Sequence, residues 1–363
     1  MIVGKEDIEG FQKKVEKGFD VINSAVGEGF VAFDVSPKQT HEESYNKVFE
    51  AFEGEEHIPL YRKTKKGLRV LVVPKKKKKR EISSLTHLAL LILTAMTVTW
   101  AGYVWWAEGN LGQSVMFAAA LMGVLGIHEL GHTVASRMRK IDATLPFFIP
   151  APPMIFPFGT FGAVIFMGSP AKNRNSLIDV GLAGPVAGFL ISIPIAIIGL
   201  KLSTIAPIST IAGEEYVFTM PLILHMLSNY LLGPISPDTV IQPHPIAMAA
   251  WAGFFVTALN ILPMGQLDGG HVIRGLFPTH FRKIFFGVAV VLPFIGILFL
   301  SPIWIFWVIL TWLLTRLNHP GPLNDVSEMD RRRKFYGAAI LLLLLILCFT
   351  PAPVIDAELL SNV

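Results

Sequence analysis

The sequence predicts a polytopic α-helical membrane protein with a small soluble α/β domain at its N-terminus. Hydrophobic residues make up 52% of the 363 residues and the mean hydropathy is +0.54. Only 16% of the residues are charged, compared with about 25% in an average soluble domain. Several apolar stretches are long enough to cross a bilayer. Roughly the first 74 residues lack such stretches and instead show the periodicities of short helices and strands.

We assign residues 1–80 to the soluble α/β domain. Its apolar residues recur first at helical spacing and later in short runs of the length of strands. The expected elements are helices over Lys5–Asp20 and Thr40–Phe52 and strands over Phe30–Val35, Ile58–Arg62 and Leu68–Val73. No catalytic pattern is visible in this domain, so we interpret it as a packing or regulatory appendage.

The domain ends in the basic run Lys75–Arg80. Such a run can bind nucleic acid. A hydrophobic stretch begins five residues later, however, and a basic cluster beside a membrane span follows the positive-inside rule. We therefore expect the lipid bilayer, and no nucleic acid, as the neighbour of this run.

Seven apolar stretches follow and predict seven transmembrane helices. Their ranges are Leu85–Trp106, Gln113–Ser136, Leu177–Leu200, Ile246–Leu262, Phe285–Leu300, Ile303–Leu314 and Tyr336–Phe349. Trp105 and Trp106 are expected to be interfacial anchors at the end of the first span. A further apolar piece, Val217–Leu232, is short and interrupted by Pro221. We interpret it as interfacial or re-entrant.

The distribution of lysine and arginine orients these helices. With a cytoplasmic N-terminus, seven spans place every basic cluster on the cytoplasmic side, and the outer segments hold one basic residue, Lys201. An eighth span over Val217–Leu232 would move the clusters around Arg274 and Arg331 to the outside. We therefore expect a multi-pass integral protein of the cell membrane with a cytoplasmic N-terminus.

The segment Thr144–Pro170 is apolar but contains repeated prolines, which exclude a regular helix. Non-helical backbone at membrane depth is tolerated only where it is buried in protein or lines a cavity. A re-entrant segment resembling a β-hairpin satisfies this requirement, and Phe158–Phe166 has the pattern of a turn followed by a strand. The alternative is an ordinary loop on the bilayer surface.

The second span contains the motif His128-Glu129-Leu130-Gly131-His132. On a helix, positions i and i+4 share one face, so His128 and His132 can bind one zinc ion. Glu129 can then take a proton from the attacking water. With the expected orientation, the two histidines lie roughly 7 and 14 Å below the cytoplasmic boundary. Ionisable groups at such depth indicate a functional site.

Catalytic zinc usually has three protein ligands, and Asp268 is the expected third. It follows the fourth span, on the same side of the membrane as the histidines, in the sequence Leu-Asp-Gly-Gly. His271 either supports the site or is a simple loop histidine. Asn260, near the end of the fourth span, either stabilises an oxyanion or makes an interhelical hydrogen bond.

These motifs together resemble the site-2 protease family of intramembrane zinc metalloproteases. The resemblance covers about residues 85–318. It rests on the His128 to His132 motif, Gly184-Pro185, and Asn260-x-x-Pro263 followed by Leu267-Asp268-Gly269. It implies a three-helix catalytic core formed by the second to fourth spans. It also implies a hairpin that presents the substrate as an extended strand, in which Phe158, Gly159, Thr160, Phe161 and Gly162 are the candidate substrate-binding residues. No PDZ-like insertion is evident between the third and fourth spans.

The expected function is therefore that of a zinc endopeptidase which cuts a transmembrane protein substrate within or near its membrane segment. One Zn²⁺ per chain would be held by His128, His132 and Asp268, with Glu129 and Asn260 as catalytic residues. Residues 85–318 form the expected protease core, and 319–363 hold a cytoplasmic loop, the last helix and an outer tail. The alternatives are a non-catalytic zinc-binding scaffold of the same fold and a zinc transporter. A transporter would need ligands staged across the bilayer, whereas these lie near one face.

Overall fold

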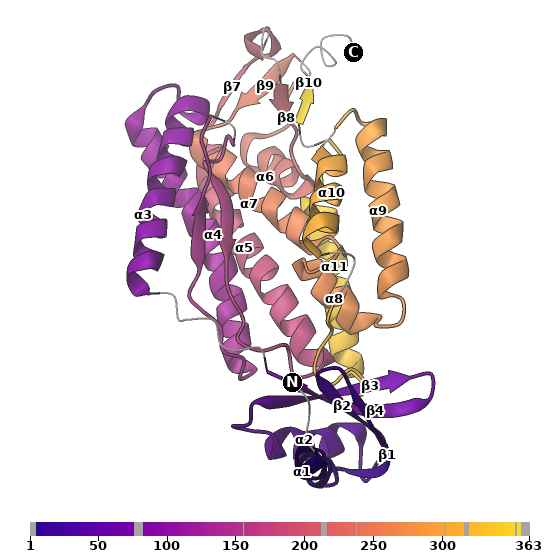
Figure 1. Cartoon of the computed structure of the whole chain (residues 1–363). Helices are drawn as coiled ribbons and strands as arrows, with labels where there is room; N and C mark the ends of the chain where they lie inside the picture. The colour runs from indigo at the N-terminus through magenta and orange to yellow at the C-terminus, as the bar shows by residue number, and fades with distance from the viewer. Residues whose placement is uncertain are drawn as a thin grey trace.

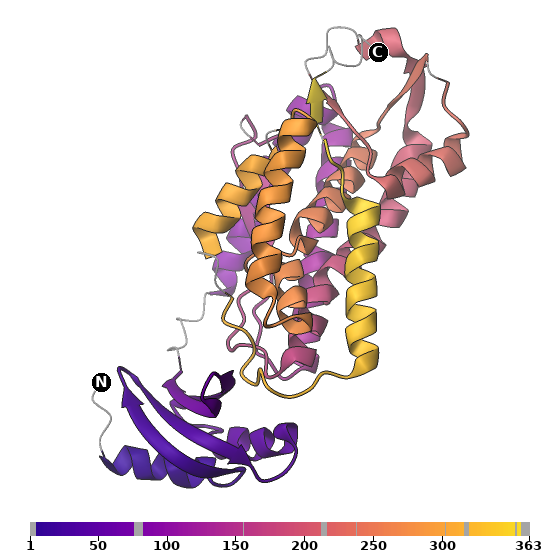
Figure 2. The ribbon, with the colours of Figure 1, turned by 90° about the vertical axis from the view of Figure 1, so that its right-hand side faces the viewer.

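The computed structural model describes residues 5–75, 83–154, 156–211, 216–236, 238–301, 303–315, 319–352 and 354–356. Most of the basic run Lys75–Arg80 lies outside the described residues, as do Arg316 and the last seven residues of the tail. A small α/β domain lies at one end of a helical bundle, and the short strand at residues 354–356 lies at the other end (Figures 1 and 2).

The N-terminal domain is a four-stranded antiparallel sheet with two helices. Its elements are α1 (Lys5–Val15), β1 (Phe19–Gly27), β2 (Phe30–Pro37), α2 (His41–Ala51), β3 (His57–Thr64) and β4 (Gly67–Pro74), with the strand order β1-β2-β4-β3. Helix α2 begins with a capping box between Thr40 and Glu43, which satisfies backbone donors that a helix start leaves free.

The first helix is shorter than predicted, and the strand after it was not predicted. α1 ends at Val15, and Phe19, expected on its apolar face, instead begins β1 and is fully buried. Gly18 separates the two elements. A Cβ at this position would lie 2.0 Å from the carbonyl oxygen of Ser44, so the chain passes α2 too closely for any side chain. Apart from Phe19, β1 is mostly exposed and lacks the alternation that identifies a strand.

A distant segment, residues 319–327, completes the N-terminal domain, and we call it the strap. The amide of Tyr61 in β3 donates to the carbonyl of Leu323 (2.8 Å), and the amide of Asp325 donates back to Tyr61 (3.2 Å). The Leu323 side chain is 2% exposed and packs within the domain's hydrophobic core. On its other side, the Leu323 amide donates to the carbonyl of Ala171 (2.8 Å), six residues before the third predicted span. The strap therefore joins the domain to the bundle.

Each of the seven predicted spans coincides with a helix. The bundle consists of α3 (Ser84–Ala101) with the π-helical turn η1 (Gly102–Trp106), α4 (Leu111–Met138), α5 (Arg174–Leu202), α6 (Leu222–Leu232), α7 (Pro245–Ile261), α8 (Asp268–Leu276), α9 (Phe281–Leu298), α10 (Ile303–Thr315) and α11 (Arg331–Cys348). Among the described residues, four helices are long and apolar enough to cross a membrane: α3 with η1, α4, α5 and α9. α7 and α10 are apolar but shorter, and α11 begins with four basic residues. The seven-span topology stays a prediction.

The end of the bundle remote from the N-terminal domain carries short strands. β7 (Thr204–Pro207) pairs with β9 (Thr239–Gln242), and β8 (Tyr216–Phe218) pairs with β10 (Val354–Asp356). The segment expected to be interfacial or re-entrant, 217–232, forms the end of β8 and the 11-residue helix α6. At 1.5 Å per residue α6 is about 16 Å long, roughly half the thickness of a hydrocarbon core.

Helices α4, α5 and α7 pack against one another at the centre of the bundle. Small residues bring these helices close together: a Cβ at Gly199 in α5 would lie 2.3 Å from the backbone of Ala247 in α7. These three helices are the second to fourth predicted spans, so the predicted central trio does form the middle of the bundle.

The proline-rich segment after α4 forms a two-stranded antiparallel hairpin, in which β5 (Phe147–Pro150) pairs with β6 (Thr160–Val164). The π-helical turn η1, which follows α3, binds the loop that connects β5 to β6. The indoles of Trp105 and Trp106 donate to the carbonyls of Pro153 and Pro157, each at 2.7 Å. These tryptophans, expected as interfacial anchors, thus also bind the hairpin. Its insertion into the membrane stays a prediction.

Candidate metal centre

His128 and His132 lie on one face of α4 and point into the bundle. They are 3% and 6% exposed. The Nδ1 of His132 lies 2.8 Å from the carbonyl oxygen of Val180 in α5. A carbonyl can only accept, so Nδ1 carries the proton and donates it there. The lone pair of Nε2 is therefore free, which is the arrangement that fixes a histidine as a metal ligand.

Asp268 is the first residue of α8. A tight turn after α7 brings it back to the histidines. A Cβ at Gly269 would lie 1.9 Å from the carbonyl oxygen of Ile261, and one at Gly270 would lie 2.4 Å from that of Gly265. Only glycines allow α8 to begin this close to the end of α7. The two glycines thus place the carboxylate at the site.

Three donor atoms converge on one point: Nε2 of His128, Nε2 of His132 and Oδ2 of Asp268. Their separations are 3.3 Å between the two nitrogens, 3.3 Å from His128 to Asp268 and 3.2 Å from His132 to Asp268. Ligands bound at about 2.0–2.1 Å with tetrahedral angles are about 3.3–3.4 Å apart. Two imidazoles and a carboxylate are also ligand types that zinc prefers. The residues therefore fit a zinc ion.

Glu129 is buried beside these ligands, and the backbone of Ile165 lies close to its carboxyl group. Ile165 directly follows β6. Glu129 thus lies where the second strand of the hairpin meets the donor atoms. A carboxyl group in this position can exchange a proton with a reacting group at the metal centre.

The two other polar candidates lie next to the ligands. Nδ2 of Asn260 is 3.3 Å from Nε2 of His128, so the amide is at the edge of the site. His271 lies on α8, one turn after Asp268, and its Nδ1 is 2.6 Å from Nε2 of His319 in the strap. The amide of Gly321 donates to the other nitrogen of His319 (2.9 Å), so His319 is the donor to His271. His271 is therefore tied to the strap.

A second contact joins α8 to the strap. The guanidinium of Arg274 pairs through both nitrogens with the carboxylate of Asp325, with 3.0 Å between Nη1 and Oδ1, and each side chain is 13% exposed. Burial lowers the pKa of Arg62, in β3, which lies near the same carboxylate. The helix that begins with Asp268 is thus connected through the strap to the N-terminal domain.

The five candidate substrate-binding residues have different environments. Phe158 packs between Trp106 and Trp251, with ring centroids 5.5 and 6.0 Å away, so it helps to fix the hairpin. Gly159 has a φ of +66° and its carbonyl accepts from Thr97 (2.7 Å). Phe161 is 56% exposed. Thr160 and Gly162 lie on β6 with Phe161. The exposed part of the set is therefore in the strand.

Sequence reasoning missed the contributions of the strap and of α5. Val180 acts through its backbone carbonyl, which no side-chain pattern reveals. Gly184, one of the positions that match the family, lies directly against the site, because a Cβ there would lie 2.0 Å from Nε2 of His132. Gly184 and Gly188 are one helical turn apart in the third predicted span. This spacing of small residues was the sequence signal for close packing of α5 on α4.

The match to known proteins covers the same region of the chain. The model of peptidase family M50 matches residues 116–302, just over half of the chain. The chain is 32% identical over 235 residues to the probable zinc metalloprotease EGY1, chloroplastic, of Arabidopsis thaliana, which covers 63% of this chain and 42% of the relative. It is 28% identical over 260 residues to the probable zinc metalloprotease EGY2, chloroplastic, of Oryza sativa subsp. indica (69% and 46%). The chain thus spans less than half the length of these relatives. No solved structure matches it.

Proposed function

The chain belongs to peptidase family M50, the membrane-embedded site-2 protease family, and from this we propose that it is a zinc endopeptidase that cleaves membrane-anchored proteins within or near a transmembrane segment. The observation that carries this proposal is the convergence of the His128, His132 and Asp268 donor atoms at 3.2–3.3 Å beside Glu129. Among the described residues, four helices are long and apolar enough to cross a membrane, and two of them, α4 and α5, contribute to that site.

In this proposal, His128, His132 and Asp268 hold the metal, and Val180 fixes the tautomer of His132. Zinc bound there supplies a Lewis acid that polarises the scissile carbonyl and acidifies water. Glu129 accepts a proton from the attacking water and passes it to the leaving amine. The amide of Asn260 can donate to the oxygen that gains negative charge in the transition state.

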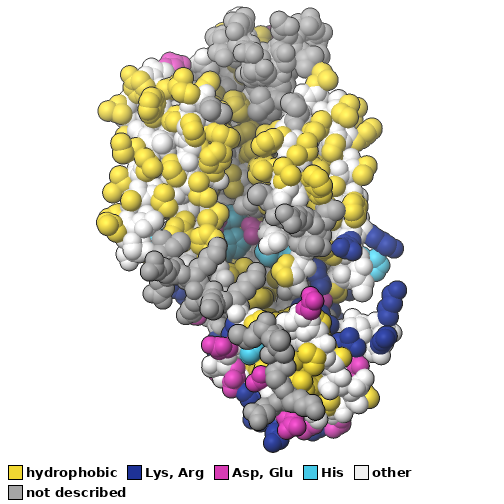
Figure 3. Space-filling model, in the orientation of Figure 1, with side chains coloured by type: hydrophobic (Ala, Val, Ile, Leu, Met, Phe, Trp, Pro, Cys, Tyr) yellow, Lys and Arg dark blue, Asp and Glu magenta, His cyan; other side chains and the backbone are white. Residues whose placement is uncertain are grey.

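Hydrolysis requires water at a site that lies within an apolar bundle. The Asp268 side chain is 16% exposed, more than either histidine. On the face drawn in Figure 3, histidine and acidic side chains are visible in a hollow between two regions of hydrophobic side chains. We propose that this hollow admits both water and the substrate segment.

A peptide bond inside a helix is hydrogen-bonded and shielded, so the substrate must unwind before it is cut. Within the described part of the chain, β6 pairs with a strand on one edge only, namely with β5. A substrate strand added to the other edge would satisfy its own backbone groups. The strand leads directly to Ile165 and thus to Glu129. Phe161 is the exposed side chain that such a substrate would meet first.

We further propose that the chain crosses the cell membrane seven times with its N-terminal domain and active site on the cytoplasmic side. On the face in Figure 3, the lysine and arginine side chains gather next to the N-terminal domain and not among the hydrophobic side chains above it. This distribution follows the positive-inside rule.

The test compares the wild type with Glu129→Ala, purified in detergent and incubated with a set of single-span substrates. Both proteins should retain about one zinc ion per chain, because Glu129 is not a ligand in this assignment. Only the wild type should cleave, and the loss should be at least about 100-fold, the usual scale of general acid–base catalysis. Equal cleavage by both proteins would refute the role of Glu129. Full zinc binding with no cleavage by the wild type would favour the non-catalytic scaffold.

A further inference from the structure

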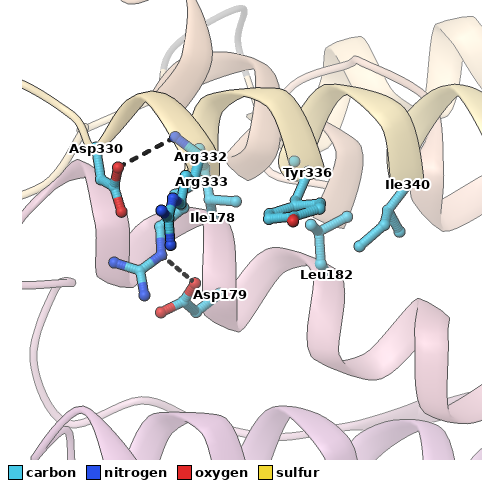
Figure 4. Close-up of a pocket in the computed structure, with 9 residues that line it drawn as sticks. Ile178, Asp179, Leu182, Asp330, Arg332, Arg333, Tyr336 and Ile340 are labelled. Carbon is cyan, nitrogen blue, oxygen red and sulfur yellow. Dashed lines mark hydrogen bonds and ion pairs between the residues drawn. The ribbon is translucent and has the colours of Figure 1, made fainter.

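A groove of about 360 Å³ lies between the beginning of α11 and the first turns of α5 (Figure 4). One end is lined by charged side chains, Arg332 and Arg333 with Asp179 and Asp330, and the other by Leu182, Tyr336 and Ile340. α11 lies at the outside of the bundle (Figure 2), and none of the three candidate metal ligands lines the groove. The proteolytic mechanism uses none of these residues.

The charged end carries an excess of positive charge. Nε of Arg333 lies 3.1 Å from Oδ1 of Asp179, and Arg139 in α4 binds the other oxygen of the same carboxylate. Asp330 accepts from the backbone amide of Arg332 and caps α11 (3.1 Å). Three arginines, Arg139, Arg332 and Arg333, thus lie at this end with these two carboxylates. The surplus is one positive charge.

Arg332 is the guanidinium available for a ligand. It is exposed, and among the described residues it makes no ion pair, in contrast to Arg333 and Arg139. Figure 4 shows it at the charged end beside Asp330. A phosphate is the group for which an arginine fork is best suited, because its planar donors match two phosphate oxygens.

The apolar end continues the groove along the helix axes. Arg333, Tyr336 and Ile340 follow one another at helical spacing on the same face of α11. Ile340 is seven residues beyond Arg333, which is roughly 10 Å further into the hydrophobic part of the bundle. Leu182 faces it from α5. The groove therefore changes from cationic to apolar over the distance that separates a lipid phosphate from its upper acyl chain.

We propose that this groove binds one phospholipid with an anionic headgroup, whose phosphate contacts Arg332 and whose acyl chain lies against Leu182, Tyr336 and Ile340. Basic pockets between transmembrane helices bind anionic headgroups elsewhere, and each basic residue near a membrane surface contributes appreciably to such binding. The proposal depends on the membrane location of the chain and not on its proteolytic activity.

Binding is measured by native mass spectrometry of the full chain in detergent, titrated with phosphatidylglycerol or phosphatidylcholine. The wild type should bind one phosphatidylglycerol at least about tenfold more tightly than phosphatidylcholine. Arg332→Gln should weaken phosphatidylglycerol binding about fivefold, the effect of one basic residue at a membrane surface. Lys283→Gln, an exposed residue at the start of α9, is the matched control and should leave binding unchanged.

A second variant distinguishes a groove from a charged surface. Ile340→Trp fills the apolar end without changing any charge and should reduce phosphatidylglycerol binding at least as much as Arg332→Gln. The proposal is wrong if both lipids bind equally, if Lys283→Gln weakens binding as much as Arg332→Gln, or if Ile340→Trp has no effect. It is also wrong if inorganic phosphate at equal concentration displaces the lipid, since the ligand would then be a free anion.

Discussion

Replacing Gly184 by alanine should disrupt the metal centre from the neighbouring helix. Gly184 lies on α5 one turn after Val180, and an added Cβ would lie 2.0 Å from Nε2 of His132 and 2.4–2.5 Å from the two adjoining ring carbons. Normal contact begins near 3.4 Å, so the ring would have to move by about 1.4 Å. The added methyl group would thus overlap the ring of His132, one of the three candidate metal ligands.

The ring cannot move freely, because its Nδ1 donates to Val180 on the same helix. Metal–ligand distances tolerate shifts of only about 0.2 Å, so His132 would be lost as a ligand. Even changes to residues that merely support a ligand lower metal affinity about 10–100-fold, and we therefore expect at least about a 100-fold loss of zinc affinity. Overpacking adds a stability cost of about 1–3 kcal/mol.

The assay is a competition titration with a zinc chelator, combined with cleavage of a single-span substrate. Gly123→Ala on α4 is the matched control, since its Cβ would have no neighbour within 4 Å and alanine is the better helix former by up to about 1 kcal/mol. It should bind zinc like the wild type. If Gly184→Ala, folded by its melting transition, binds zinc with unchanged affinity, the described packing of α5 on His132 is incorrect.

Two further predictions concern the strap. Asp325→Ala leaves Arg274 almost buried and unpaired, so it should lower the free energy of unfolding by about 3–5 kcal/mol and make residues 319–327 more sensitive to limited proteolysis. The control Asp34→Ala breaks a more exposed pair with Arg69 and should cost less than about 1 kcal/mol. Equal losses for the two variants in thermal melts would contradict the buried role of Asp325. Burial, together with His271 and Arg274, lowers the pKa of His319 to about 2. The unfolded chain, with a pKa near 6.5, therefore binds a proton that the folded chain does not, and this residue should reduce stability by up to about 1.4 kcal/mol per pH unit as the pH falls below 6.5. His319→Gln should flatten that dependence between pH 7 and pH 5 in melts, and unchanged slopes would refute it.

Site residues whose arrangement depends on spacing within one helix could be predicted from the sequence. The positions of His128, Glu129 and His132 follow from helix periodicity, and hydropathy located the helices. Asp268 was found by placing a lone acidic residue on the same side of the membrane as the histidines. Its position at the start of α8, next to the end of α7, depends on glycines whose close contacts only the structure shows.

Backbone partners and long-range contacts could not be predicted in this way. The carbonyl of Val180 selects the tautomer of His132, yet any residue could supply it. Leu323 enters the core of a domain more than 240 positions earlier in the chain, and nothing around it distinguishes it from other loop leucines. β1 was missed because its side chains are mostly exposed and show no alternation.

The strap also sets an order of events during synthesis. β3 is an edge strand of the N-terminal sheet, and its outer edge is covered at Tyr61 by strap residues that lie roughly 245 positions after the end of β4. At about 5–20 residues per second, the ribosome needs roughly 12–50 s to make that stretch. Throughout this interval the outer edge of β3 is unpaired at Tyr61, and the core of the nascent domain lacks the side chain of Leu323. Strands of other chains can add to such an unpaired edge. Complete folding of the N-terminal domain therefore waits for the strap, and a chain truncated before the strap begins would keep this aggregation-prone edge permanently.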